Sequence, residues 1–304
     1  MKLLRFESAG GPVIGVVSSD GIVPIADLLP EYREMRQLAA AGPDALARLA
    51  DKLASATPTV ALEGAKLLAP IERPGNFLAT GMNYKKHCLE AVRLGVPPPR
   101  FQIWFIKASN AISAPYADID PGVTQRLDYE VELGFVIGKR ARYVSPEDAP
   151  GHIFGYLVGN DVSARDWQMH ASTFTIGKSF ETFGPIGPWI VTPDEIGDPH
   201  DLELRCHVNG ELRQQGNTSD MIYSLWEMIE YVSTAFVLEP GDVVLTGTPE
   251  GVGHAMTPQT YLQPGDVVRC EIEKIGAIEN RIVASRARRN PVLEEDKIAR
   301  VLAG

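Results

Sequence analysis

RLDYEVELGFVIG, residues 126–138, is the stretch of the sequence that most clearly indicates the fold. Apolar and acidic side chains alternate in its first half, so a strand here places Asp128, Glu130 and Glu132 on one face. The apolar, glycine-containing residues 134–138 indicate that the far end of this strand is buried. The stretch therefore predicts a buried β-strand with three acids on one face, although a solvated strand face is the ordinary explanation of a Glu-x-Glu pair.

Short β-branched or aromatic runs separated by Gly, Pro and Asn surround this strand and predict a mainly β fold. These runs are FQIWFI (101–106), IFGYLVGN (153–160), PWIVT (188–192), LELRCHVNG (202–210), DVVLTG (242–247) and DVVRCEIEKI (266–275). Asn209-Gly210 between alternating segments predicts a β-hairpin. Pro-Gly-Asp-Val-Val occurs at 240–244 and again at 264–268, and we expect both copies to begin strands.

The first 69 residues have a different pattern, which predicts a small α/β domain. Strand-like runs at 3–6, 13–17 and 21–25 precede helix-favouring stretches at 35–42 and 44–54. Two prolines and a glycine within 70–75 interrupt the pattern, so we predict a boundary there and a larger domain over 70–304, with a polar tail from about 286. Within that domain, helices are expected at 83–95 and at 219–236, the latter capped by Thr218 or Ser219.

Composition excludes several classes of partner. A formal net charge of −10 and the lack of a Lys/Arg-rich block argue against nucleic acid. Glu7 and two glycines stand where a signal peptide needs an apolar run, and no later run approaches a membrane span. Cys88, Cys206 and Cys270 have no C-x-x-C spacing and suit reduced thiols. We expect a cytoplasmic protein that binds neither nucleic acid nor membrane.

A further acid, Asp161, directly follows the apolar run 153–160, which is a predicted strand. Strand ends are common places for functional residues. With Glu130 and Glu132, Asp161 makes three carboxylates without a paired His or Cys. Such an oxygen-rich set suits Mg²⁺, Mn²⁺ or Ca²⁺ rather than structural zinc, and it leaves positions open for water and substrate.

Three further polar residues are candidates for substrate contact. Arg165 and Gln168 lie three apart on one side of a predicted helical turn, where a substrate carboxylate could dock. The alternative for Arg165 is a surface pair with Asp161 or Asp166. Lys178 is the one cation in the Gly-, Pro- and aromatic-rich stretch 175–189, and an ordinary solvated lysine is its alternative.

His87 and Glu90 stand at i and i+3 of the predicted helix, so Glu90 can orient the imidazole and the pair can deprotonate water. An ordinary surface contact is the alternative. Cys88 suggests a thiol nucleophile, but adjacent helical residues do not face one another. GTPEGVG, residues 247–253, lacks the Gly-Lys-Ser/Thr ending of a phosphate loop, while its glycines permit close backbone approach and Thr248 offers a hydroxyl.

Five ordered motifs, taken together, resemble the fumarylacetoacetate hydrolase family. They are G-x-N-Y-x-x-H-x-x-E, D-Y-E-x-E, G-x-x-x-x-N-D-V-S-A-R-D-x-Q, G-K-S-x-x-x-x-x-P-x-G-P and G-D-V-V-x-T-G-T-P-x-G-V-G, over roughly residues 70–285. The resemblance implies a mixed, mainly β fold of the β-roll type behind a small N-terminal α/β domain, and a homodimer. It also assigns nine roles: metal ligands Glu130, Glu132 and Asp161, catalytic residues His87, Glu90 and Lys178, and substrate-binding residues Arg165, Gln168 and Thr248.

The activity that the resemblance implies is hydrolysis of a C–C bond in a small 2,4-diketo acid of the acylpyruvate type, with Mg²⁺ or Mn²⁺, giving pyruvate and a carboxylic acid. A 2-keto acid decarboxylase, lyase or isomerase of the oxaloacetate decarboxylase type is the alternative, because the same enolate serves each reaction. Hydrolysis is preferred because the His87–Glu90 pair can activate water, which decarboxylation does not need. A non-catalytic metal-binding or scaffold protein is a third possibility, which the His87–Glu90 pair disfavours.

Overall fold

The computed structural model describes residues 1–19, 21–290 and 300–302. Its strands are β1 (Lys2–Ser8), β2 (Gly11–Ser18), β3 (Gly21–Pro24), β4 (Val60–Ala61), β5 (Leu67–Leu68), β6 (Phe77–Gly81), β7 (Ile103–Lys107), β8 (Ile112–Ser113), β9 (Leu127–Asp128), β10 (Val131–Ile137), β11 (Ile153–Asn160), β12 (Ser163–Ala164), β13 (Gly184–Val191), β14 (Glu203–Val208), β15 (Glu211–Asn217), β16 (Val243–Leu245), β17 (Val267–Ile272) and β18 (Gly276–Arg281). Its helices are α1 (Ile25–Leu28), α2 (Met35–Ala40), α3 (Gly42–Leu53), α4 (Lys85–Arg93), α5 (Arg165–Gln168), α6 (Pro193–Ile196) and α7 (Leu225–Ala235), with 3-10 turns η1 (Ser109–Ala111), η2 (Ala149–His152), η3 (Thr218–Asp220) and η4 (Gly253–Ala255). The fold is thus mixed and mainly β, as predicted.

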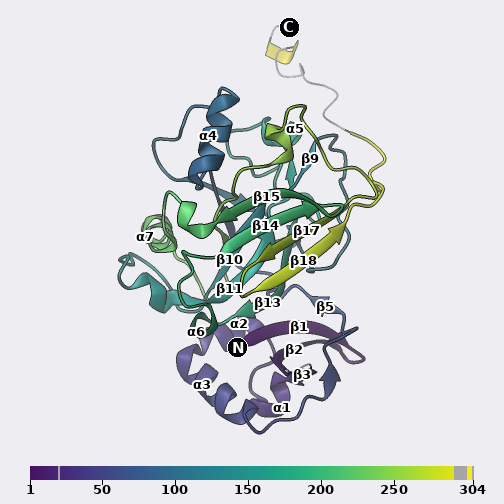
Figure 1. The fold of residues 1–304 in the computed structure, drawn as a ribbon. Helices are drawn as coiled ribbons and strands as arrows, with labels where there is room; N and C mark the ends of the chain where they lie inside the picture. Colours follow the sequence, from purple (N-terminus) through teal and green to yellow (C-terminus); the bar gives the residue numbers. More distant parts are fainter. Residues whose placement is uncertain (20, 291–299, 303–304) are drawn as a thin grey trace.

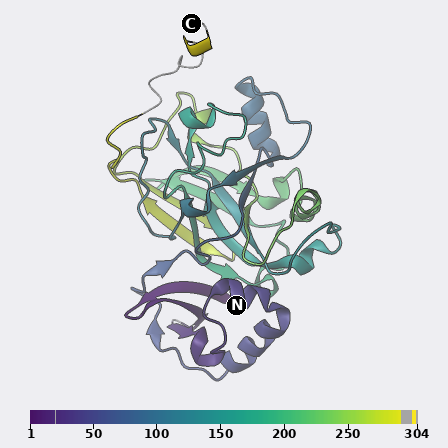
Figure 2. The same ribbon diagram turned by 180° about the vertical axis from the view of Figure 1, so that it is seen from behind.

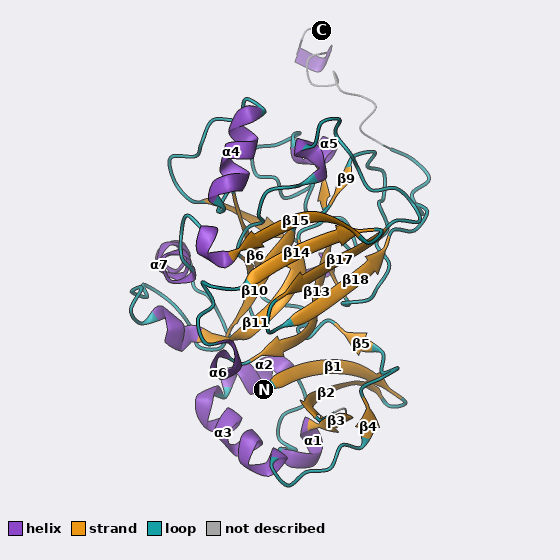
Figure 3. Ribbon diagram, viewed as in Figure 1, coloured by secondary structure: helices purple, strands orange, loops and turns teal. Residues whose placement is uncertain are grey.

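A 12-stranded mixed sheet forms the centre of the molecule, with β10 and β11 paired antiparallel in its middle (Figures 1 and 3). Every residue of β10 is buried. Leu133 and Phe135 pack into one hydrophobic core, whereas Val136 packs into a second core on the other face. Because both faces are covered, this strand carries a near-continuous apolar run instead of a strict alternation.

A four-stranded antiparallel sheet, ordered β15-β14-β17-β18, covers one face of the central sheet. Leu204, Val268 and Ile272 of this sheet share a core with Leu133 and Phe135 of β10. The predicted hairpin joins β14 to β15 through Asn209 and Gly210, whose φ values of 52° and 81° are those of a type I′ turn. Both Pro-Gly-Asp-Val-Val segments lead into strands, β16 and β17, as expected.

The N-terminal residues form the predicted strands and helices, and they extend the central sheet. β1 pairs with β13, and β2, β3 and β4 follow outward from β1. Helices α1–α3 lie with these strands at one end of the molecule, whereas α4, α5 and β9 lie at the opposite end (Figures 1 and 2). The strand pairing between β1 and β13 therefore joins the two predicted domains through one continuous sheet.

Two local predictions were wrong. The helix expected from residue 219 begins at Leu225 instead, because Ser224 and Glu227 form a capping box in which the Glu227 carboxylate accepts the Ser224 N–H at 2.8 Å. Thr218 belongs to the 3-10 turn η3. The single strand expected through residues 128–132 is also interrupted, since β9 ends at Asp128 and β10 begins at Val131.

None of the helices in the described part of the chain is long and apolar enough to cross a membrane. Of the predicted polar tail, residues 291–299 and 303–304 lie outside the described residues. The three cysteines form no disulfide, in agreement with their prediction as free thiols.

Candidate active site

The three predicted metal ligands come together where the two central strands end. Glu130 directly precedes β10, Glu132 is its second residue, and Asp161 directly follows β11. The antiparallel register pairs Val131 with Asn160, which brings the three acids to one edge. One carboxylate oxygen from each acid lies within 4.8 Å of those from the other two, and all three side chains are buried. The glutamates line a cavity of about 350 Å³.

Buried cations hold two of these acids. The Lys178 ammonium donates to Glu130 Oε2 and to Asp161 Oδ2, both at 2.7 Å, and Arg165 Nη2 donates to Glu130 Oε1 at 2.6 Å. Burial would raise the pKa of Glu130, but the charges of Lys178 and Arg165 outweigh it and lower that pKa. Lys178 is therefore a buried partner of the acids rather than a solvated lysine.

Glu132 is buried, with 1% of its surface exposed, yet among the described residues it has no ion-pair partner. Its carboxylate accepts the Gly247 N–H at 2.7 Å. Burial, followed by the neighbouring charges of Asp161 and Glu130, raises its pKa well above the usual range. A buried carboxylate without a cation is costly. The arrangement thus fits a divalent cation, which would supply the positive charge that Glu132 lacks.

A second buried lysine, which the sequence analysis missed, also contacts the acids. Lys107 is the last residue of β7 and is fully buried, and its ammonium donates to Asp161 Oδ1. Burial lowers the pKa of Lys107, against the attraction of the Asp161 charge. The only local signal is a lysine at the end of the apolar run FQIWFI.

Asp128 was placed on the same strand face as the glutamates, but it has a different function in the structure. Its carboxylate accepts Arg165 Nε at 2.8 Å, and it also accepts the backbone N–H groups of Gly253 at 2.8 Å and His254 at 2.9 Å. Asp128 therefore fixes both the Arg165 guanidinium and the loop after β16. The aspartate belongs to the D-Y-E-x-E motif, which gave no hint of this role.

The predicted substrate-binding residues also line the cavity. Arg165 is buried and donates from Nη1 to Gln168 Oε1 at 3.0 Å, and neither of the predicted surface pairs forms. Its pairing with Asp128 and Glu130 raises its pKa against the effect of burial. Thr248 donates its hydroxyl to the Val131 carbonyl at 2.9 Å, so towards a ligand it can act only as an acceptor in this arrangement.

Helix α4 brings His87 and Glu90 to the same cavity. His87 Nδ1 lies 2.9 Å from Glu90 Oε2, and each side chain is 15% exposed. The other Glu90 oxygen accepts the Gly251 N–H at 3.0 Å. Gly251 has φ +101°, and a Cβ there would lie 2.1 Å from the Arg213 carbonyl oxygen. The glycine-rich segment 247–253 thus donates one N–H to Glu132 and another to Glu90.

Cys88 is not positioned as a nucleophile. Its thiol donates to the Met82 carbonyl at 2.9 Å, and burial raises its pKa. The structure therefore gives no support to the thiol mechanism that the sequence suggested.

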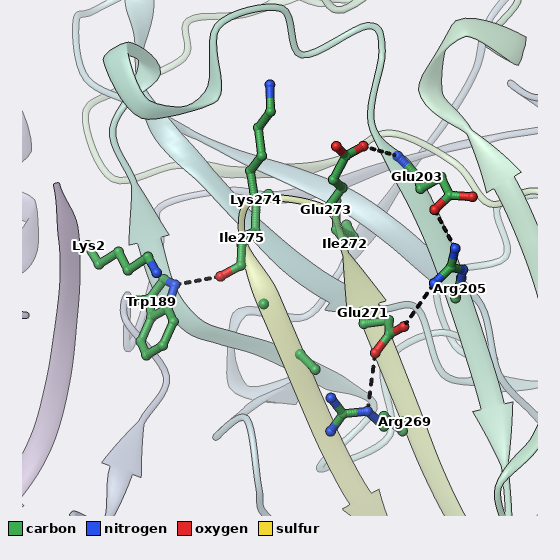
Figure 4. Close-up of a pocket in the computed structure, with 12 residues that line it drawn as sticks. Lys2, Trp189, Glu203, Arg205, Arg269, Glu271, Ile272, Glu273, Lys274 and Ile275 are labelled. Carbon is green, nitrogen blue, oxygen red and sulfur yellow. Dashed lines mark hydrogen bonds and ion pairs between the residues drawn. The ribbon is translucent and has the colours of Figure 1, made fainter. Parts of the chain in front are cut away.

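A second hollow, of about 430 Å³, lies between β1 and the outer sheet (Figure 4). Its two arginines are paired with glutamates: Arg205 contacts Glu203 and Glu271, and Arg269 contacts Glu271. Trp189 donates from its indole to the Ile275 carbonyl at 2.7 Å. Its arginines are paired, its Lys2 ammonium lies over the Trp189 ring and its Lys274 ammonium donates to the Ile196 carbonyl, so this hollow lacks the convergent polar groups of a reaction centre.

A mainly β fold with three clustered carboxylates and a His–Glu pair over one cavity defines a class of metal-compatible enzymes. Within that class, the family model of the fumarylacetoacetate hydrolase C-terminal region matches residues 76–283. The chain belongs to the fumarylacetoacetate hydrolase family, as its ordered motifs indicated. The match begins close to the predicted boundary near residue 70.

Similar proteins include several described as oxaloacetate tautomerases. The mitochondrial oxaloacetate tautomerase FAHD2B of Bos taurus is 41% identical over 291 residues, covering 93% of this chain and 92% of that protein. The mitochondrial oxaloacetate tautomerase of Xenopus laevis is 43% identical over 291 residues, covering 93% and 90%.

The similar solved structures belong to enzymes whose names cover a broader range of reactions. Maleylpyruvate hydrolase from Sphingobium sp. SYK-6, in complex with manganese(II) and pyruvate, has a TM-score of 0.78 and 30% identity, covering 94% of this chain and 100% of that one. A 5-carboxymethyl-2-hydroxymuconate delta-isomerase from Mycobacterium smegmatis has a TM-score of 0.74 and 33% identity, covering 94% and 99%. The relatives therefore favour the isomerase alternative over hydrolysis, while keeping both within the family.

Proposed function

We propose that this chain is a divalent-metal-dependent enzyme that interconverts the enol and keto forms of oxaloacetate or of a closely similar 2-keto acid. The observation that carries the proposal is the trio Glu130, Glu132 and Asp161, buried with oxygens within 4.8 Å of one another beside a cavity that also contains a His–Glu pair. The tautomerase names of relatives at 41–43% identity support the same reaction. We favour this reaction over the hydrolysis expected from the sequence.

Mg²⁺ or Mn²⁺ would be held by the three carboxylates, and it would supply Lewis acidity that polarises the keto oxygen of the substrate. Lys178 and Lys107 hold Asp161 from the protein side. Arg165 retains N–H groups beyond its three recorded bonds, and Gln168 retains its amide N–H₂, so both can donate to the substrate carboxylate.

Proton transfer falls to His87. Its Nδ1 is engaged by Glu90 at 2.9 Å, which leaves Nε2 to exchange a proton with the substrate. In the ketonisation direction the enol hydroxyl loses a proton and carbon 3 gains one, so the reaction needs neither water nor a redox partner. The Gly251 N–H donates to the second Glu90 oxygen and holds that carboxylate in place, so the His87 imidazole keeps its orientation during the proton transfer.

Hydrolysis of a 2,4-diketo acid is the second candidate, because the same His87–Glu90 pair can take a proton from water. Its products would be pyruvate and a carboxylic acid. Decarboxylation of oxaloacetate needs no such base and so makes less use of the pair. The homodimer, the cytoplasmic location and the domain boundary at residue 70 remain predictions from the sequence.

One experiment separates these reactions. Purified protein is mixed with enol oxaloacetate, keto oxaloacetate or acetopyruvate, with Mg²⁺, with Mn²⁺ or with chelator, while enol absorbance and pyruvate are measured separately. A tautomerase accelerates loss of the enol without forming pyruvate, a decarboxylase forms pyruvate from oxaloacetate, and a hydrolase forms it from acetopyruvate. Turnover that persists in chelator would refute the metal site, and Glu132→Gln serves as the matched inactive variant.

A further inference from the structure

Strand β15, at the edge of the outer sheet, buries a glutamine and exposes a leucine. Gln214 is 1% exposed and Leu212 is 46% exposed, whereas glutamine is ordinarily found at the surface. Gln214 pairs with Cys206 of β14, but Leu212 pairs with the residue directly after Cys206. Arg213 is therefore the extra residue of a β-bulge, a feature that re-aims the side chains beside it. The bulge turns Gln214 towards the central sheet.

The Gln214 amide makes hydrogen bonds whose directions are fixed. Its Oε1 accepts the Val131 N–H at 3.0 Å, and its Nε2 donates to the Pro249 carbonyl at 2.9 Å. A backbone N–H can only donate and a carbonyl can only accept, so the two ends of the amide cannot be exchanged. The other Nε2 hydrogen goes to Thr248 Oγ1 at 2.8 Å. Both amide hydrogens are thereby used inside the protein.

These bonds close a ring around the backbone that joins two of the proposed metal ligands. Val131 lies between Glu130 and Glu132 in the chain. The Thr248 hydroxyl, which accepts from Gln214, donates its own hydrogen to the Val131 carbonyl at 2.9 Å. Gln214 and Thr248 together thus hold the N–H and the carbonyl of Val131. Hydrogen bonds linked in this way polarise and strengthen one another.

The same amide also holds the glycine-rich segment 247–253. That segment donates one N–H to Glu132 and another to Glu90. The two residues that Gln214 contacts lie between these two donors in the chain. A Cβ at Gly216, two residues after Gln214, would lie 2.5 Å from a side-chain carbon of the segment, so β15 packs directly against it. One outer-sheet residue therefore connects the metal side of the site with its proton-transfer side.

We propose that Gln214 is a positioning residue, which keeps the backbone between Glu130 and Glu132 in register with the glycine-rich segment. The inference rests on the proposed function, because binding one divalent cation is what that spacing of the acids would serve. Gln214 acts through backbone groups and through Thr248 rather than on the reacting atoms. Removing hydrogen-bonded partners that stand behind metal ligands typically lowers metal affinity or activity by about 10–100-fold.

The first test compares Gln214→Met with Gln215→Met, a change at the exposed neighbour on the same strand. Methionine keeps the length of the side chain and removes the bonds to Val131, Thr248 and Pro249. Calorimetry measures Mn²⁺ binding to the metal-free proteins. We expect Kd to rise about tenfold or more in Gln214→Met and to change by less than about twofold in Gln215→Met. An unchanged Mn²⁺ affinity in Gln214→Met would overturn the assignment.

A double-mutant cycle with Thr248→Val separates positioning from a general loss of stability. If Gln214 acts through the ring, Gln214→Met should lower kcat/KM at least about threefold less in the Thr248→Val background, where the ring is already open. An equal fold-change in both backgrounds would contradict the proposal. Steady-state kinetics use whichever of enol oxaloacetate, keto oxaloacetate and acetopyruvate the wild type turns over.

A second variant keeps the proposal testable if Gln214→Met does not fold. Gln214→Glu retains an acceptor for the Val131 N–H and loses both donated hydrogens, so Mn²⁺ affinity should not fall while kcat/KM does; unchanged kcat/KM would refute the role of Gln214. If wild type turns over no substrate, the proposed reaction fails and the Mn²⁺ affinities alone decide on Gln214. A wild type that binds no Mn²⁺ would refute the metal site, and the positioning role with it.

Discussion

Replacing Lys107 by Met tests how the charges of the site are balanced. Lys107 is fully buried and its ammonium contacts Asp161. Removing one partner of a buried ion pair costs about 3–5 kcal/mol, and the lower end applies here because Asp161 Oδ1 loses its charged donor while Oδ2 keeps Lys178. At this chain length each kcal/mol corresponds to about 2 °C in Tm, so the metal-free variant should melt about 6 °C below wild type.

The same reasoning predicts an unequal response to metal. A divalent cation at the three carboxylates would take over the neutralisation of Asp161, so saturating Mn²⁺ should raise the Tm of Lys107→Met by several degrees more than that of wild type. Thermal melting with Mn²⁺ and with chelator measures both increments, and Lys66→Met, at an exposed lysine, is the matched control. If Mn²⁺ raised the Tm of the variant and of wild type by the same amount, the idea that Lys107 supplies positive charge to Asp161 when no metal ion is bound would be refuted.

Four other changes probe the remaining parts of the site. His87→Ala should lower kcat by about 10²–10⁴-fold while the Mn²⁺-induced rise in Tm is retained, since it removes the proton-transfer group and no metal ligand; loss of the metal response would contradict that separation. Gly251→Ala places a Cβ 2.1 Å from the Arg213 carbonyl oxygen, so we expect a lower Tm and a lower kcat together, measured by melting and steady-state kinetics. Chelator should abolish turnover, and Mn²⁺ or Mg²⁺ should restore it, whereas Glu132→Gln should show no Mn²⁺-dependent rise in Tm.

The parts of the site that the sequence predicted are those with a local signal. Asp161 stands directly after an apolar run, and Glu130 and Glu132 share the spacing of a strand face. Antiparallel pairing of β10 with β11 then brings the start of β10, with Glu130 and Glu132, next to the end of β11, with Asp161. The mainly β fold followed from the same runs and from turn residues such as Asn209-Gly210.

The missed features depend on contacts between distant segments. Lys107 lies 54 residues before Asp161, and only the pairing of β7 at the sheet edge brings them together. The strand break before β10 has no local signal either, because side chains replace the expected ladder bonds. The Glu130 N–H donates to Asn160 Oδ1 at 3.1 Å and the Val131 N–H to Gln214 Oε1 at 3.0 Å. Neither partner can be recognised before the fold is known.

The charges around the cavity limit which substrates the site can hold. The buried groups are the acids Asp128, Glu130, Glu132 and Asp161 and the cations Lys107, Arg165 and Lys178, a net charge of −1 when all are ionised. A divalent cation would bring this to +1, which one carboxylate of a 2-keto acid neutralises. A second carboxylate would then meet no net positive charge, so its binding must depend on directed hydrogen bonds. Arg165 and Gln168, which line the cavity and retain N–H groups beyond their recorded bonds, can supply such directed hydrogen bonds.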